Sequence, residues 1–146
     1  MPGIIVGIDG SGHSQRALEW AMNEAALRHV PLTVIIVHEV AAGYRGSAIT
    51  YPEDYALADR ARCLAQDEAD KMLAGLAGPR PESVTVEAMS GVPAEELITS
   101  SRNADLIVLA SRGAGGSARL LPGSTSSEVA CHAHCPVVII PPQDRR

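Results

Sequence analysis

The sequence predicts an α/β fold: a three-layer sandwich with helices on both faces of a five-stranded parallel sheet of order 3-2-1-4-5. First, short apolar runs of strand length alternate with segments whose apolar residues recur at helical spacing. Second, glycines and prolines stand between these segments, where turns are needed. Third, strands separated by helices pair in parallel through right-handed crossovers.

The first strand and helix are predicted at residues 4–8 and around residues 18–26. The run IIVGI is apolar and has the length of a buried strand, and the apolar residues after it repeat at helical spacing. Either Ser11 or Ser14 is placed to cap this helix by accepting from its free N–H groups. Pro31 is expected to end it.

The second strand is predicted at residues 32–37 (LTVIIV), another apolar run. Residues 41–52 hold turn formers and small residues and are expected to form a loop. Apolar positions spread from residue 57 to residue 76 then predict a long amphipathic helix, which Gly78 and the following prolines break.

The remaining strands are predicted at residues 84–88, 105–109 and 137–140. The first of these alternates apolar and polar residues, which is typical of a half-exposed strand and places it at a sheet edge. Pro93 is expected to begin the helix after it. The last helix is expected to run from a cap at Ser124 to about residue 133.

Length and composition predict one domain over residues 1–146. Hydrophobic residues make up 46% of the chain and the net charge is −5, which favours a folded core and argues against a basic face for nucleic acid. No apolar run approaches the roughly 20 residues of a membrane span. The chain opens on a strand without a secretory signal, and its three cysteines lack disulfide-framework spacing. We therefore expect a cytoplasmic protein with reduced thiols.

The connection after the fourth strand has the composition of an anion-binding loop. Residues 110–127 read ASRGAGGSARLLPGSTSS. Glycine lets a backbone approach a ligand closely, and a helix start offers free N–H groups and a positive dipole to phosphate. The single lysine, Lys71, lies elsewhere and no G-x-x-x-x-G-K-[ST] motif occurs, so this is not a Walker-type loop. The sequence predicts a phosphorylated ligand, with a nucleotide favoured.

Polar residues follow the strands at the edge where such a ligand would bind. Asp9 follows the first strand, and His38 and Glu39 follow the second. In an open parallel sheet, ligands bind outside the carboxyl ends of the strands where the strand order reverses. Here that point lies between the first and fourth strands, so we expect the base over strands one and two and the phosphates at the glycine-rich loop.

The chain resembles the universal stress protein family from end to end. Its IIVGIDGSGHSQRALEWA is similar to that family's first strand and helix, and LTVIIVHEV, ADLIVLASRG and CPVVII are similar to its later strands. The family's nucleotide motif is G-x-x-G, nine residues, then G-[ST]. Residues 110–113, nine further residues and Gly123-Ser124 match it in register, with Ala110 in place of the first glycine. Because alanine is the smallest replacement, we expect binding to survive unless this position needs a positive φ.

The resemblance implies a Rossmann-like fold of the adenine nucleotide alpha hydrolase-like type and an ATP-binding, dimeric regulator of stress response with at most slow ATP hydrolysis. Mg²⁺ would accompany the triphosphate, with Asp9 as an oxygen ligand. The implied contacts to adenine and ribose are Gly7, Ile8, Asp9, the backbone near Glu39, Leu109 and Ala110. The implied contacts to phosphate are Gly113, Gly123, Ser124, Thr125 and Ser126.

Each of these features also has a purely structural interpretation. Asp9 could close a turn by an Asx hydrogen bond, the loop glycines could be turn formers, and Ser124 could act only as a cap. Arg112 and Arg119 could reach phosphate oxygens or remain solvated.

Two other functions also stay open. One is a nucleotide hydrolase or transferase with His13 or His38 as the base, although no adjacent base–nucleophile pair or acidic cluster supports fast hydrolysis. The other is a nucleotide-free dimer that acts through protein contact alone.

Two clusters of chemically distinctive residues lie outside the nucleotide motif. Cys131, His132, His134 and Cys135 could hold zinc, but structural zinc sites usually draw on two separated segments, so we interpret this stretch as a helix end. The three tyrosines, Tyr44, Tyr51 and Tyr55, lie in or just after the loop predicted at residues 41–52. They could form a lid that stacks on adenine, or pack locally or against a partner.

The last strand predicts an oligomer. Residues Val137, Val138, Ile139 and Ile140 form a wholly apolar run at the sheet edge. Edges of this kind invite pairing and need cover. We expect an isologous dimer through this strand, and the family resemblance implies the same.

Overall fold

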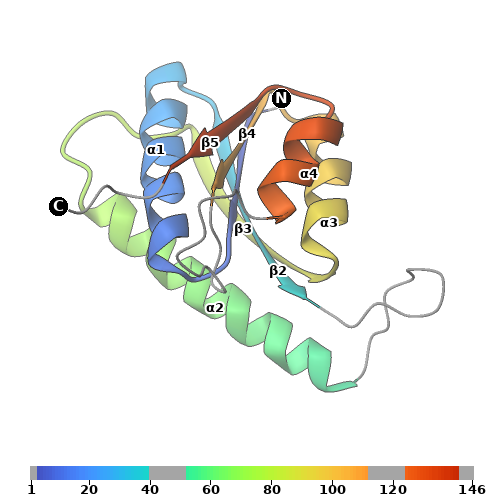
Figure 1. The fold of residues 1–146 in the computed structure, drawn as a ribbon. Helices are drawn as coiled ribbons and strands as arrows, with labels where there is room; N and C mark the ends of the chain where they lie inside the picture. The colour runs from blue at the N-terminus through green and yellow to red at the C-terminus, as the bar shows by residue number, and fades with distance from the viewer. Residues whose placement is uncertain (1–2, 40–51, 112–123, 142–146) are drawn as a thin grey trace, which may run out of the picture.

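The computed structural model describes residues 3–39, 52–111 and 124–141 of the chain. The strands in these ranges form one five-stranded parallel sheet of order β3-β2-β1-β4-β5. Helices α1 and α2 cover one face, and α3 and α4 cover the other (Figure 1). The predicted fold class and strand order are confirmed.

The strands occupy the predicted segments. They are β1 (Ile4–Ile8), β2 (Pro31–Glu39), β3 (Ser83–Gly91), β4 (Leu106–Ala110) and β5 (Val137–Ile140). Strands β2 and β3 are longer than their apolar runs indicated, because their parallel pairing continues in register from Pro31↔Ser83 to Glu39↔Gly91. Along residues 83–88 of β3, exposed and half-buried residues alternate, as expected for an edge strand.

The helices begin and end at recognisable local signals. They are α1 (Gly12–Arg28), α2 (Pro52–Ala74), α3 (Pro93–Ser100) and α4 (Ser124–His132), with a 3₁₀ turn, η2 (Ser101–Asn103). Ser11, rather than Ser14, is the N-cap of α1, because its side chain accepts from the backbone N–H of Ser14. Prolines are the first residues of α2 and α3, where a missing N–H costs nothing.

Two helix boundaries differ from the prediction. Helix α1 ends at Arg28, and the left-handed His29 (φ 57°) satisfies the carbonyls of the last turn with its own N–H. Pro31 therefore does not end the helix but opens β2, a position that proline tolerates. Pro52 belongs to α2 rather than to the preceding loop.

The pleat of β1 divides the core between the two faces of the sheet. Ile4, Val6 and Ile8 pack under α1 and α2, whereas Ile5 packs under α3 and α4. Gly7 faces the same side as Ile5, where an added Cβ would lie 2.7 Å from the Leu109 side chain. A side chain larger than that of glycine would therefore force the Leu109 side chain to shift.

Candidate nucleotide-binding site

Strands β1 and β4 part at the carboxyl edge of the sheet. Their parallel pairing runs from Ile4↔Leu106 to Val6↔Val108, and the last two residues of each strand extend beyond it. These residues are Gly7, Ile8, Leu109 and Ala110, four of those predicted to contact adenine and ribose. The structure therefore brings them together at the switch point of the strand order, where open α/β sheets bind ligands.

Asp9 follows directly and shapes the turn between β1 and α1. Its Oδ1 accepts from the Ser11 N–H at 2.9 Å, and its own N–H donates to Ser14 Oγ at 3.3 Å. Gly10 takes a positive φ of 84° within this turn. The Asx-turn interpretation of Asp9 is confirmed. This hydrogen bond uses one of the acceptor positions of the carboxylate.

Ala110 stands where the family motif has its first glycine, and its backbone is ordinary strand. Among the described residues other than glycine, His29 alone has a positive φ. Ala110 also pairs in register with Ile140 of β5. The conformational objection to alanine at this position therefore does not apply.

The phosphate end of the predicted site is described only in part. Residues 112–123 lie outside the described residues, and with them the predicted contacts Gly113 and Gly123 and the arginines Arg112 and Arg119. Helix α4 begins at Ser124, as predicted. Thr125 is half-buried, and Ser126 is buried with an exposed fraction of 3%.

Glu39 ends β2 at the same edge of the sheet. Its backbone pairs with Gly91 of β3, and β2 is the neighbour of β1 in the sheet. The contact of this backbone with the base stays a prediction.

Glu68, on α2, was not predicted as a site residue. Its Oε2 is buried and has no hydrogen-bond partner among the described residues. Burial raises the pKa of Glu68, the negative charge of Asp9 raises it further, and Lys71 lowers it. The one available signal was its position beside the buried Ala65 and Ala69, next to the apolar stripe of the helix.

The cysteine–histidine stretch forms the end of α4 and the turn into β5. Cys131 is exposed and Cys135 is half-buried. Burial and the nearby Asp105 raise the pKa of the Cys135 thiol, against a smaller opposing effect of a backbone hydrogen bond from Ile107. Within the described ranges no group of three or more His, Cys, Asp or Glu is placed to hold a metal ion. Helix α4 ends at His132, within this stretch.

The tyrosine cluster is visible only at Tyr55. Tyr44 and Tyr51 lie outside the described residues. Tyr55 stands near the start of α2 with an exposed fraction of 70%. The lid and the local-packing interpretations both remain predictions.

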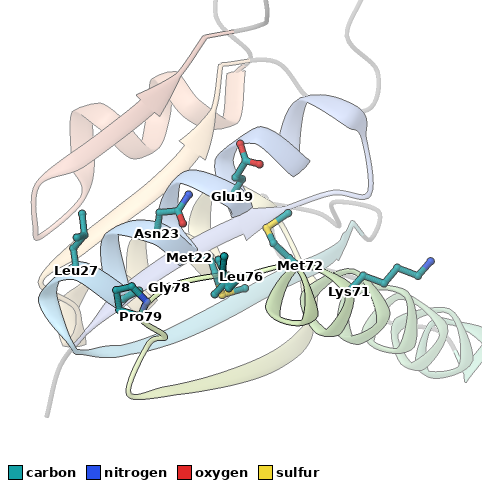
Figure 2. A pocket seen from close by; sticks show the side chains of 12 residues that line it. Glu19, Met22, Asn23, Leu27, Lys71, Met72, Leu76, Gly78 and Pro79 are labelled. Carbon is teal, nitrogen blue, oxygen red and sulfur yellow. The ribbon is translucent and has the colours of Figure 1, made fainter.

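A separate pocket of about 640 Å³ lies between α1 and the end of α2 (Figure 2). Met22, Met72 and Leu76 form its apolar part, and Glu19 and Asn23 stand on the α1 side. Residues from the C-terminal halves of both helices line the pocket, whereas Asp9 precedes the N-terminus of α1. The pocket therefore lies away from the turn that holds Asp9.

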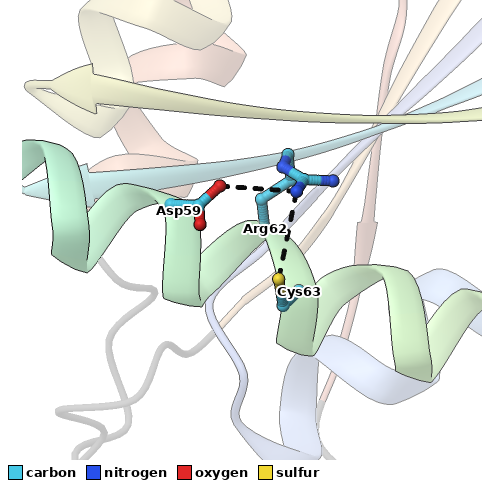
Figure 3. A network of polar contacts seen from close by, with 3 residues as sticks. All are labelled: Asp59, Arg62 and Cys63. Carbon is cyan, nitrogen blue, oxygen red and sulfur yellow. Dashed lines mark hydrogen bonds and ion pairs between the residues drawn. The ribbon is translucent and has the colours of Figure 1, made fainter.

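The solvent side of α2 carries a small polar group. Arg62 Nη2 lies 3.3 Å from Asp59 Oδ1 and 3.9 Å from the Cys63 sulfur (Figure 3). All three residues are exposed, and such surface ion pairs add little to stability. This group is therefore a feature of the helix surface.

The described fold and the position of its switch point fit the comparison with known proteins. The universal stress protein family model matches residues 2–141. This chain belongs to the universal stress protein family. Two universal stress proteins of Mycobacterium tuberculosis are similar to it, at 33% identity over 145 residues and 34% over 156 residues. The alignments cover 97% and 98% of this chain but 48% and 49% of those proteins, so the chain spans about half the length of these relatives.

Solved structures of the universal stress protein family share the fold. The chain is similar to UspA from Lactobacillus plantarum with a TM-score of 0.77 and 27% identity, covering 95% of this chain and 97% of that one. A universal stress protein from Archaeoglobus fulgidus, solved in complex with dAMP, is similar with a TM-score of 0.58 and 26% identity, covering 96% and 97%. In the part of this chain that the structure describes, no helix has the length and hydropathy needed to cross a membrane.

Proposed function

We propose that this universal stress protein domain binds ATP at the crevice between β1 and β4 and serves as a dimeric, cytoplasmic regulator in stress response. The observation that carries the proposal is the parting of the two strands after Val6 and Val108, with Asp9 directly beyond it. The complex of the Archaeoglobus fulgidus relative with dAMP supports an adenine nucleotide as the ligand class.

The described residues fit the chemistry of an adenine nucleotide. Asp9 and Glu68, whose buried Oε2 has no hydrogen-bond partner in the described ranges, have acceptor oxygens that suit the hydroxyl and amino groups of a nucleoside. The first turn of α4 offers N–H groups and a positive dipole to phosphate. A Mg²⁺ ion accompanying the triphosphate would be held mostly by phosphate oxygens and water, with Asp9 as a protein ligand.

The dimer would form through β5. This strand ends the sheet, and Val137, Val138 and Ile139 are half-buried along it. Pairing with a second copy would satisfy its outer backbone groups and cover these side chains. In this proposal the protein senses or sequesters nucleotide and signals through protein contact, with ATP turnover below about 1 s⁻¹, the lower end of the usual enzyme range.

Calorimetric titration with ATP tests the nucleotide site. Asp9→Asn keeps an acceptor for the Ser11 N–H, and hence the turn, but removes the charge. We expect it to weaken ATP binding about tenfold or more, because hydrogen bonds to charged groups are the stronger ones.

Asp67→Asn is the matched control, since Asp67 is an exposed carboxylate on α2, and its ATP affinity should equal that of the wild type. Failure of the wild-type protein to bind ATP at millimolar concentration would contradict the proposed function. A turnover well above 1 s⁻¹ would favour an enzyme instead.

A further inference from the structure

Glu68 carries a buried acceptor that the fold leaves unused. Its Oε2 is shielded from solvent and has no hydrogen-bond partner among the described residues. An unsatisfied buried polar atom costs free energy, more so when it belongs to a charged group, and native proteins rarely keep one without a reason. The carboxylate therefore has an unmet requirement for a donor.

The packing of α2 fixes where this acceptor stands. Ala65 and Ala69, on either side of Glu68 in the sequence, are buried with exposed fractions of 1% and 0%. Helix α2 packs against β2, β3 and α1 on the same face of the sheet. These buried alanines hold this side of α2 against the sheet, and Glu68 between them is half-buried with its Oε2 shielded from solvent.

Among the described residues, one negative and one positive side chain act electrostatically on Glu68. Asp9, at the end of β1, is close enough to act electrostatically on Glu68. Lys71, one helical turn further along, acts in the opposite direction but is exposed. Two acidic side chains thus lie near the end of β1, and a ligand with donor groups would suit their acceptor oxygens.

An adenine nucleotide brings two kinds of donor, the ribose hydroxyls and the exocyclic amine, whereas its phosphates bring none. Acidic side chains that recognise nucleotides in related α/β sheets bind ribose hydroxyls. Building on the proposed nucleotide site, we propose that Glu68 of α2 accepts a hydrogen bond from a ribose hydroxyl of the bound nucleotide, its buried Oε2 standing beside Asp9 at the end of β1. Helix α2 then contributes directly to the selection of a ribonucleotide.

Titrations with three nucleotides test this role. The wild-type protein, Glu68→Ala and the control Asp67→Ala are each titrated with ATP, 2′,3′-dideoxy-ATP and ITP, which lacks the amine. We expect the wild type to bind the dideoxy nucleotide about tenfold more weakly than ATP. Glu68→Ala should bind ATP about as much more weakly than the wild type does, whereas its affinity for the dideoxy nucleotide should equal that of the wild type. Asp67→Ala should match the wild type for all three nucleotides.

Each other outcome has a distinct meaning. Equal losses of ATP and dideoxy-ATP affinity in Glu68→Ala, or no loss at all, would overturn the role of Glu68. A third outcome is that Glu68→Ala binds dideoxy-ATP more weakly than the wild type does but binds ITP equally well. That result would assign Glu68 to the amine and would also overturn the ribose contact. Absence of ATP binding in the wild type would instead contradict the proposed function. If Glu68→Ala is misfolded by circular dichroism, Glu68→Gln is used, which keeps an acceptor and should show a smaller loss for ATP alone.

Discussion

Some residues near the carboxyl edge of the sheet could be predicted from the sequence, and others could not. Asp9 was identified from its position after an apolar run, because ligands and turns both use the residue that follows a strand. Gly7 was predicted as a ligand contact, and the structure gives an independent reason for a glycine there: an added Cβ would lie 2.7 Å from the Leu109 side chain. Glu68 was not predicted as a site residue, because an acidic residue in an amphipathic helix normally faces solvent, and only tertiary packing brings it within electrostatic reach of Asp9.

The raised pKa of Glu68 predicts a gain in stability when its charge is removed. Burial and Asp9 make the ionised form unfavourable in the fold. The favourable contribution of the protonated form is therefore complete below the ordinary glutamate pKa of 4.5 and is lost as the pH rises through the raised folded-state value. Glu68→Gln should be more stable than the wild type at pH 7, with the advantage vanishing below pH 4.5.

Urea denaturation of both proteins at pH 7 and at pH 4 measures this difference. Asp67→Asn, an exposed neighbour, should show no comparable gain at pH 7. An advantage of Glu68→Gln that is the same at both pH values would argue against an electrostatic origin. A residue that weakens the free protein and strengthens its complex is expected at a binding site, where local stability is often sacrificed.

At the scale of elements, the predicted strands were found because buried parallel strands are short apolar runs with little ambiguity. Helix boundaries were harder. The end of α1 depends on His29 adopting a left-handed conformation, which no local motif announced. The start of α2 at Pro52 depends on a proline that fits either a loop or the first turn of a helix.

The N-cap of α1 links this helix to the turn that positions Asp9. Ser11 Oγ accepts a hydrogen bond from the Ser14 N–H at 3.2 Å, and the backbone N–H of Ser11 donates one to the Asp9 carboxylate. Ser11→Ala should cost about 1 kcal/mol of unfolding free energy, the usual loss for a cap. Ser11→Asn, which can also cap, should retain most of it, and thermal or urea denaturation distinguishes the two variants. Equal losses in both variants would show that the cap hydrogen bond is not the cause.

In the whole molecule, β5 forms an outer edge of the sheet with no partner strand on its far side among the described residues. The strand order, with β5 at one end, follows from the alternation of strands and helices, but nothing in that alternation specifies what covers β5. The opposite edge, β3, alternates exposed and half-buried residues along residues 83–88 and so suits solvent. Strand β5 has no such alternation, because Val137, Val138 and Ile139 are all half-buried.

The dimer through β5 predicts a specific response to a charge placed on that strand. Ile139 is half-buried and packs partly against the cluster under α3 and α4, so Ile139→Lys places a charge at the proposed interface. We expect the wild type to be dimeric at micromolar concentration by light scattering, and Ile139→Lys to be monomeric, since lysine on an edge strand opposes pairing. Ile98→Lys is the matched control, because Ile98 packs partly against the same cluster but belongs to α3. This control variant should lose about as much stability as Ile139→Lys but remain a dimer. A wild-type monomer, or dissociation of both variants to the same extent, would show that β5 is not the interface.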